Sequence, residues 1–315
     1  MPTPFRLSAY FGAYFLYAGA FVPYFALYLA ARGFGAVEIA AVMAMPQLAR
    51  VAAPTFWGWL ADRSGAGRDI VVGSGLALVA GYPVLGAAQG AVAVALVMLL
   101  MSLLSAGALP IVEAITMASL EGRAERYGPI RMWGSIGFIA GVLGTGLWLD
   151  AHTPPSLLRV VVALAVLSLG ASLLLPATRS HPVTAGGEAG LGEVLRRPEV
   201  IALLAAGGCM AAAHGALYGF FSLHAQSLGY SKTAIGALWT LGVVAEIGVF
   251  LAWSRLARRW SLRLLLVAGF ACAVARFLAI GWGTHLPALP CAIGIDQPNY
   301  WHYYYSVGIV PAFEI

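Results

Sequence analysis

Residues 57–63 read Trp57-Gly58-Trp59-Leu60-Ala61-Asp62-Arg63, at the end of an apolar stretch. Residues 253–259 read Trp253-Ser254-Arg255-Leu256-Ala257-Arg258-Arg259, again at the end of an apolar stretch and 196 residues later. The same offset, without gaps, places Arg50 on Glu246, so that one charged residue within an apolar stretch falls on another. Self-similarity at a fixed offset indicates a structural repeat, so the second half of the chain is predicted to repeat the first.

The composition excludes a soluble fold. Of 315 residues, 61% are hydrophobic and 10% are charged, whereas a typical soluble domain has about 25% charged residues. A soluble fold of this size would leave a large apolar surface in water. Apolar stretches of about 20 residues, the length that a helix needs to cross the hydrocarbon core, recur along the chain. The sequence therefore predicts an all-α polytopic membrane protein in contact with the lipid bilayer.

These stretches set the predicted domain organisation. About nine transmembrane helices are expected, at residues 7–31, 36–60, 69–88, 91–118, 129–149, 156–176, 199–227, 233–254 and 262–283. The first six form a predicted N-terminal six-helix transmembrane bundle over residues 1–176, and a polar cytoplasmic linker follows at 177–198. Residues 199–286 are predicted to hold the first three helices of an incomplete C-terminal bundle.

The segment at residues 287–315 does not continue this pattern. The repeat predicts a further helix there, but the segment holds four prolines and two acidic residues. Proline breaks helices and charge is unfavourable in lipid, so no lipid-facing helix is expected in this aberrant tail. The chain is expected to be C-terminally truncated or frame-shifted, and an inactive remnant of a longer protein stays an open alternative.

Basic residues set the predicted orientation. With the N-terminus in the cytoplasm, twelve loop arginines lie inside, whereas Arg32, Arg159 and Lys232 lie outside. The prediction is a multi-pass protein of the cell (inner) membrane. The formal charge of +5 comes from short clusters between apolar stretches, which argues against binding to nucleic acid. The three cysteines are scattered without zinc spacing, so neither a metal nor another cofactor is expected.

A resemblance to a known superfamily follows from the repeat. Six helices separate the two copies, so both cross the membrane in the same direction, which is the architecture of the major facilitator transporters. The stretch Gly58-Trp59-Leu60-Ala61-Asp62-Arg63-Ser64-Gly65, with Arg68 following, resembles that superfamily's signature between helices 2 and 3, although Ala66-Gly67 intervene. The resemblance implies a gating element that consists of Gly58, Asp62, Arg63, Gly65 and Arg68.

Each signature residue has an expected physical role. Glycine allows close helix approach and tight turns, which we expect at Gly58 and Gly65. Asp62 is expected to cap or pair with basic groups at neighbouring helix ends and so to hold one conformation. The alternative is a charged loop that only anchors the helices.

Five charged residues fall within or at the edge of the apolar stretches: Arg50, Glu113, Arg131, Glu246 and Arg276. Charged groups inside a bilayer are costly unless they pair or face water, so each is a candidate functional residue. They are expected to line a central aqueous cavity that binds solute and exchanges a proton. The structural alternative is that the arginines pair with the glutamates and simply hold helices together.

A narrower resemblance concerns the start of the fifth helix. The segment Tyr127–Phe138 resembles that of the proton symporters for oligosaccharides, nucleosides and phenylpropionate. In the sugar symporters an acid on helix 4 and an Arg on helix 5 contact substrate, and Glu113 and Arg131 match those positions. Glu246 and Arg276 match a second acid and Arg by helix. The run from Pro46 to Asp62 most resembles the phenylpropionate permease branch.

The residues favour an anionic aromatic solute. Three buried arginines exceed two buried glutamates, and a carboxylate would balance the excess and bind Arg in bidentate fashion. The first stretch adds an aromatic stripe at helical spacing: Tyr10, Tyr14, Tyr17, Phe21, Tyr24 and Tyr28. Tyr14, Tyr17 and Phe21 are expected to stack on a substrate ring, with a packing seam as the alternative. His214 is expected to contact substrate or join a proton relay, and His224 to be a solvated interface residue.

The predicted function is proton-coupled symport by alternating access. Glu246 is expected to take a proton from outside before a small organic anion, such as a phenylpropionate, binds near Arg50, Arg131 and Arg276. Glu113 is the second predicted proton-coupling residue. A sugar or nucleoside symporter stays open, whereas an intramembrane enzyme would need a metal cluster or an activated nucleophile, and a sensor would need a soluble domain. A monomer is expected.

Overall fold

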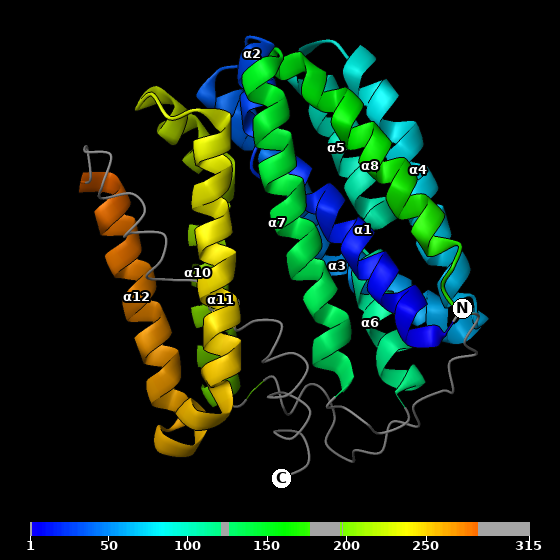
Figure 1. Ribbon diagram of the computed structural model, residues 1–315, viewed down its shortest axis with the longest axis vertical. Coiled ribbons are helices and arrows are strands. Elements are labelled where there is room, and N and C mark those ends of the chain that lie inside the picture. Colours follow the sequence, from blue (N-terminus) through cyan, green and yellow to red (C-terminus); the bar gives the residue numbers. More distant parts are fainter. Residues whose placement is uncertain (1, 121–125, 177–195, 197, 283–315) are drawn as a thin grey trace. The chain divides into compact units, whose positions relative to one another are not determined.

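The computed structural model describes residues 2–120, 126–176, 196 and 198–282, and these residues are almost entirely helical with no β-strand among them (Figure 1). The helices of the first half are α1 (Thr3–Phe21), α2 (Phe25–Ala31), α3 (Ala36–Ser64), α4 (Gly67–Ala87), α5 (Gly90–Ser105), α6 (Ala108–Ser119), α7 (Tyr127–Ala151), the short 3₁₀ helix η2 (Pro154–Ser156) and α8 (Leu157–Ser172). Those that follow are α10 (Pro198–Ser227), α11 (Lys232–Arg259) and α12 (Leu262–Trp282).

The predicted transmembrane stretches coincide with helices. Within the described residues, seven helical segments are long and apolar enough to cross a membrane, from Thr3–Ala31 to Val200–Ser227. The two further predicted spans, 233–254 and 262–283, fall on α11 and α12, except that residue 283 lies outside the described residues. The aberrant tail at 287–315 lies outside them as well, and so does nearly all of the linker predicted at 177–198.

Two of the spans are broken helices. Pro23 separates α1 from α2, since it has no N–H to continue the helical hydrogen bonding and its ring crowds the preceding turn. Ala106 and Gly107 separate α5 from α6, and Pro110 follows in the first turn of α6. At the end of α3, Gly65 closes the helix in the left-handed conformation (φ 65°) and donates its N–H to the carbonyl of Ala61 at 2.9 Å.

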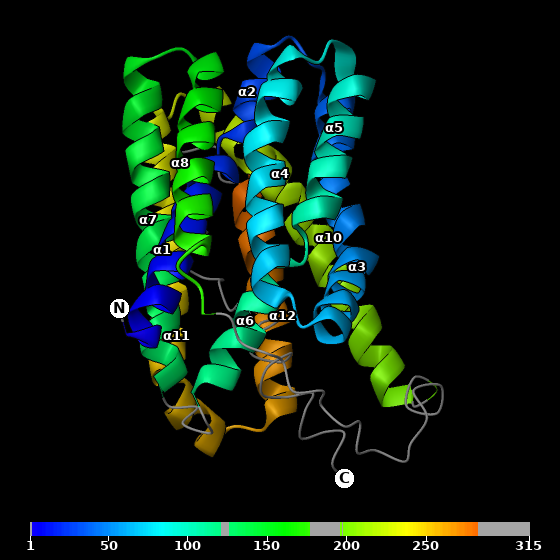
Figure 2. The same ribbon diagram turned by 90° about the vertical axis from the view of Figure 1, so that its right-hand side faces the viewer.

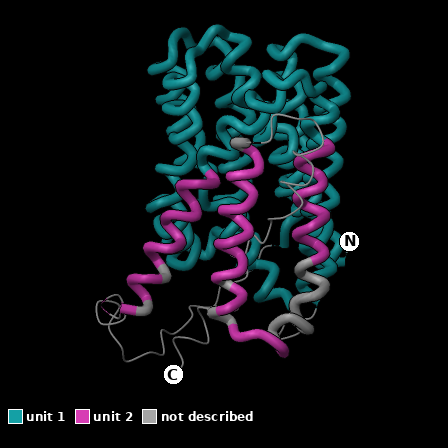
Figure 3. The backbone as a smooth tube through the Cα atoms, turned by 90° about the vertical axis from the view of Figure 1, so that its left-hand side faces the viewer, with its two compact units in different colours: residues 1–183, 215–236 teal, residues 184–214, 237–315 magenta. Residues whose placement is uncertain are grey.

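The chain forms two compact units (Figure 3). The first consists of Met1–Val183 together with Gly215–Gly236, which includes the end of α10 and the start of α11. The second consists of Thr184–His214 and Ala237–Ile315. The predicted division into bundles at 1–176 and 199–286 stays a prediction.

Helix α1 is enclosed by other helices of the first unit. It packs mainly against α7 and α8 and also touches α6, while α4 packs against α5 and α8 (Figure 2). The α1–α7 contact brings the two backbones together at two glycines of α7. A Cβ on Gly137 or Gly141 of α7 would lie within 3 Å of the carbonyl oxygen of Gly12 or Leu16 of α1. Small residues thus let the two backbones touch, as is common where helices pack in membranes.

Candidate functional site

Arg131 lies one turn into α7 and rests on two aromatic rings of α1. Its guanidinium carbon is 4.1 Å from the ring centroid of Phe15 and 5.6 Å from that of Phe11. Tyr127, one turn earlier on α7, shares a side-chain hydrogen bond with Arg131. Cation–π contacts and a hydrogen bond hold the guanidinium in place, and a positioned planar fork is the geometry that binds a carboxylate.

Four predicted site residues come together around Tyr14. Tyr14 of α1 is within electrostatic range of Arg50 from α3, Glu113 from α6 and Arg131 from α7. Glu113 is half-buried and in turn interacts electrostatically with Arg131. Arg50 is exposed, and its Nη1 donates to Gln47 Oε1 at 3.3 Å. The first unit therefore gathers two cations, one acid and a phenol that come from four different helices.

The break between α5 and α6 fixes the helix that carries Glu113. The indole Nε1 of Trp57 donates to the carbonyl of Leu103 at 2.7 Å, and Ser74 Oγ donates to the carbonyl of Leu104 at 3.0 Å. A Cβ on Gly107 would lie within 3 Å of the Trp57 side chain, so the indole rests directly on the break. Helices α3 and α4 thus satisfy carbonyls at the break, as buried backbone groups in a bilayer require.

The aromatic side chains of α1 form a continuous column. Ring pairs stack between Tyr10 and Tyr14 (5.9 Å between centroids) and between Tyr17 and Phe21 (6.2 Å). The column continues through Phe21 and Phe25 at 4.6 Å. Tyr14, Tyr17 and Phe21, which were predicted to contact substrate, are thus packed on one another along one face of the helix.

Two members of the column were missed by the sequence analysis. Tyr82 of α4 packs against Tyr17 at 6.1 Å, and the two hydroxyl oxygens are hydrogen-bonded at 2.5 Å. Phe25 takes the place expected for Tyr24, whose hydroxyl instead donates toward the carbonyl of Val142 in α7 at 2.9 Å. The break at Pro23 shifts the helical register, so the 3–4-residue spacing could not be followed from α1 into α2.

A second group of predicted site residues lies in the second unit. Arg276 of α12 is only 1% exposed, and its Nη2 lies 3.1 Å from His214 Nε2 on α10. His214 Nδ1 lies 3.0 Å from the carbonyl of Met210. A carbonyl only accepts, so Nδ1 carries the proton, and Nε2 of this neutral imidazole accepts from the guanidinium. Phe277 completes the group beneath Arg276, with 4.9 Å from its ring centroid to the guanidinium carbon.

Glu246 belongs to the same unit. It lies half-buried on α11, in the part of the helix after Gly236. The contact of Arg276 with His214 was not predicted from the sequence, which paired the arginine with a glutamate only in the structural alternative. An imidazole at this site can accept a proton and would then lose its bond to the guanidinium.

The signature residues lie at the junction of α3 and α4. Gly65 makes the expected tight turn. Arg68 Nη2 donates to the carbonyl of Leu173 at 2.6 Å, at the end of α8, so it ties α4 to α8. Arg63 and Asp62 are exposed, and the Arg63 guanidinium lies over the Trp59 ring at 5.7 Å.

The expectation for Gly58 was wrong in one respect. A Cβ at Gly58 would meet no atom within 4 Å in the described part of the chain, so close helix packing does not explain this glycine. The closest packing of glycine in this unit lies instead on α7, at Gly137 and Gly141. A gating role for the five signature residues stays a prediction.

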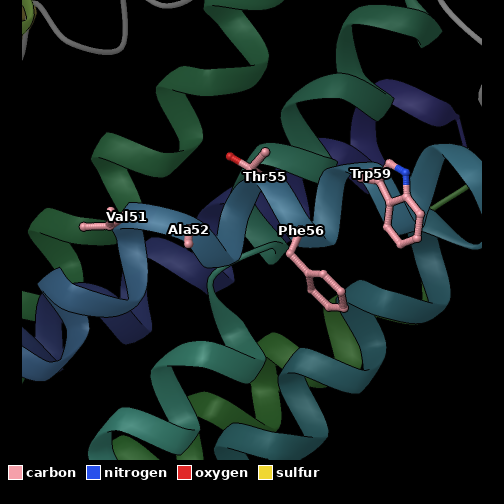
Figure 4. A pocket seen from close by; sticks show the side chains of 5 residues that line it. All are labelled: Val51, Ala52, Thr55, Phe56 and Trp59. Atoms are coloured by element: carbon pink, nitrogen blue, oxygen red, sulfur yellow. The ribbon is translucent and has the colours of Figure 1, made fainter.

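A shallow pocket on α3 is not the candidate site (Figure 4). Its lining, Val51, Ala52, Thr55, Phe56 and Trp59, comes from this one helix and contains no charged group. Phe56 and Trp59 are 52% and 55% exposed, as expected of aromatic side chains on a membrane-facing surface. Among the described residues, no group of three or more His, Cys, Asp or Glu is placed to hold a metal ion.

Two known transport proteins are similar to this chain in sequence. The probable 3-phenylpropionic acid transporter of Escherichia coli (strain K12) is 32% identical over 204 residues, which cover 62% of this chain and 52% of that protein. The maltose permease of Geobacillus stearothermophilus is 29% identical over 310 residues, which cover 92% of this chain and 75% of that protein. The chain thus spans about half the length of the first of these relatives.

Solved structures confirm the predicted fold. The crystal structure of the nucleoside transporter NupG aligns over 100% of this chain and 83% of that chain, with a TM-score of 0.79 and 17% identity. A point mutant of the same transporter gives a TM-score of 0.85 at 15% identity, over 100% of this chain and 84% of that chain. The chain is therefore an all-α polytopic membrane protein with the major facilitator fold. The model of the MFS_1 like family matches residues 5–306, nearly the whole chain, and the chain belongs to that family of major facilitator transporters.

Proposed function

We propose that this chain acts as a proton-coupled symporter that imports a small aromatic carboxylate, of the phenylpropionate type, by alternating access. The observation that carries the proposal is the position of Arg131, whose guanidinium rests on Phe15 and lies within electrostatic range of Tyr14. A carboxylate has the charge and the two oxygens that a guanidinium binds. An aromatic column begins beside the same residues, so an arylalkyl acid fits both features.

The charge balance supports an anion. Arg50 and Arg131 share the environment of Tyr14 with one acid, Glu113. Protonation of Glu113 would leave two uncompensated cations there, and an anionic solute would restore neutrality. The relative whose printed name is probable 3-phenylpropionic acid transporter, 32% identical over 204 residues, points to the same class of solute.

Proton coupling is assigned to the two acids that lie within the apolar helices. Glu246 and Glu113 are half-buried carboxyl groups in segments that cross the membrane, where ionisable residues mark the pathways of protons and solutes. The His214–Arg276 pair supports this assignment, because a neutral imidazole that accepts from a guanidinium is a further group that protonation would alter. The same proposal includes the organisation and location of the protein. We expect two bundles, a cytoplasmic N-terminus, a place in the inner membrane and a monomer that acts as a carrier and not as an enzyme.

The first test is uptake of 3-phenylpropionate into proteoliposomes with an imposed proton gradient. Arg131→Lys keeps the charge and removes the planar fork, so uptake efficiency (kcat/KM) is expected to fall at least about tenfold. Arg126→Lys is the matched control, an exposed arginine at the start of the same helix, and should transport normally. Uptake that is equal in the Arg131→Lys variant and in the parent would contradict the role of Arg131.

A sugar symporter is the second candidate. The maltose permease aligns over 92% of this chain, a longer alignment than that of the phenylpropionic acid transporter. The two candidates are separated by competition, with maltose, a nucleoside and benzoate each added in excess over labelled 3-phenylpropionate. If benzoate is the one competitor that inhibits uptake, the result supports an aromatic acid as the solute. If the protein instead accumulates maltose when a proton gradient is imposed, the sugar symporter replaces the proposed function.

A further inference from the structure

The end of α7 is tied by hydrogen bonds to the start of α11 within the first compact unit. Asp150, the penultimate residue of α7, is exposed. Its carboxylate oxygens accept hydrogen bonds from the backbone N–H groups of Lys232 (2.8 Å) and Thr233 (2.9 Å), the first two residues of α11. An acid on one helix therefore caps the N-terminus of another.

This cap is not needed for α11 to begin. Ser231 precedes the helix and its Oγ accepts the N–H of Ala234 at 3.1 Å, which is the usual N-cap bond from within the same chain segment. The carboxylate of Asp150 adds a favourable charge at the positive end of the helix. Since α11 has its own cap, the distinctive effect of Asp150 is to hold the first two residues of α11 against the end of α7.

A buried tyrosine joins these two segments to a third, the start of α2. The Tyr24 hydroxyl lies 2.9 Å from the carbonyl of Val142 in α7 and 3.0 Å from the carbonyl of Lys232 in α11. Tyr24 is 0% exposed and precedes α2 directly. One hydroxyl proton serves both carbonyls, so the bond to Lys232 can be given up while the bond to Val142 keeps the buried hydroxyl satisfied.

Gly146 of α7 and Gly236 of α11 leave room for close contact between the end of α7, the start of α11 and Tyr24. A Cβ on Gly146 of α7 would lie 2.8 Å from the Lys232 carbonyl oxygen, and a Cβ on Gly236 of α11 would lie 2.6 Å from the Tyr24 hydroxyl. A Cβ on Gly146 would also lie 2.7 Å from the Tyr24 hydroxyl, so the phenol is the side chain that packs against both glycines. The start of α11 can therefore leave α7 once Tyr24 gives up its bond to the Lys232 carbonyl.

We propose that Asp150, Tyr24, Gly146 and Gly236 form a clamp between the end of α7 and the first residues of α11, and that this clamp opens and closes during transport. Every contact in it can break without burying an unsatisfied group, because Asp150 is exposed and Tyr24 retains Val142. The glycine seam between α1 and α7 differs, since Gly137 and Gly141 bring the backbone of α7 directly onto the carbonyls of Gly12 and Leu16. The clamp rests on alternating access but not on the identity of the solute or the coupling ion.

The test is a distance measurement between two spin labels. With the native cysteines 209, 272 and 291 replaced by serine, Thr153→Cys and Gln226→Cys place nitroxides on exposed positions near the ends of α7 and α10. Pulsed dipolar spectroscopy without solute then gives the fraction of the long-distance, open population. Asp150→Asn, which loses the charge, is expected to raise this fraction about three- to tenfold, and Asp150→Glu is expected to restore the parent distribution.

Gly236→Ala tests the clamp by a steric route. Its methyl group would contact the Tyr24 hydroxyl, so the open fraction should rise without any change of charge. Two controls are matched to the two routes. Glu38→Gln removes an exposed carboxylate that caps its own helix at Gly35 N (2.8 Å), and Gly248→Ala makes the same substitution on α11 where no described atom lies within 4 Å.

The outcomes separate the clamp from a merely structural cap and from the proposed function. A larger open fraction in Asp150→Asn and in Gly236→Ala, with neither control changed, supports the clamp. An unchanged distribution in both variants overturns it, as does an equal rise in the two controls. Should Asp150→Asn fail to fold, Gly236→Ala decides alone. Because no solute is present, loss of 3-phenylpropionate uptake has no bearing on the result.

Discussion

At the scale of single residues, the two candidate arginines are held by different means. Arg131 rests on aromatic rings of a neighbouring helix, where a cation–π contact contributes about 0.5–2 kcal/mol without neutralising the charge. Arg276 is almost fully buried and donates to a neutral histidine. Arg131 thus keeps its charge available for an anion, whereas the environment of Arg276 depends on whether His214 carries a second proton.

Glu246→Gln tests the assignment of proton coupling. Glutamine matches the neutral acid in shape but cannot release a proton, so accumulation driven by a proton gradient should fall to background while solute exchange persists. Counterflow and gradient-driven uptake, measured on the same proteoliposomes, distinguish the two. Glu38→Gln, an exposed acid outside the candidate site, is the control. Undiminished accumulation by Glu246→Gln would refute its proton-coupling role.

At the scale of helices, the broken spans and the glycine seams position the site. Trp57 and Ser74 bind the carbonyls that precede the α5–α6 break, and Glu113 lies two turns beyond it. The seam between α1 and α7 brings the rings of Phe11 and Phe15 under Arg131. The site therefore depends on how closely two backbones approach rather than on local helix propensity.

Gly137→Ala tests the α1–α7 seam. The new methyl group would meet the carbonyl of Gly12, and overpacking of this kind destabilises by about 1–3 kcal/mol. The apparent melting temperature of the detergent-solubilised protein should fall by several degrees. Gly144→Ala on the same helix, where no described atom lies within 4 Å, should leave it unchanged or raise it. Equal melting temperatures for the two variants would show that the seam is not close-packed in solution.

At the scale of the whole molecule, the distribution of basic residues predicts the sidedness of the membrane protein. Ser64, at the end of α3, is expected to face the cytoplasm, and Thr153, after α7, the outside; both are exposed. In a background without native cysteines, a membrane-impermeant thiol reagent should label Thr153→Cys in intact cells and Ser64→Cys only after permeabilisation. The reverse pattern would invert the predicted topology.

Much of the fold could be predicted from the sequence. The apolar stretches located the helices, because a bilayer requires a long run of apolar residues with internally satisfied backbone groups. The repeated segment at Trp57 and Trp253 led to the major facilitator architecture, and the chain has that fold. What the stretches could not show is where a span is broken, since Pro23 interrupts a helix whereas Pro46 and Pro54 lie inside α3 without ending it.

The sequence by itself determined which residues are charged within the membrane, since that follows from counting along apolar stretches. Only the tertiary structure decided their partners: Arg276 with His214, and Arg131 with Phe11 and Phe15. Tyr82 and Asp150 were missed because their roles depend on helices 65 and 82 residues away in sequence. Periodicity describes one helix at a time, whereas a site and a clamp are made where several helices meet, and packing alone determines which faces meet.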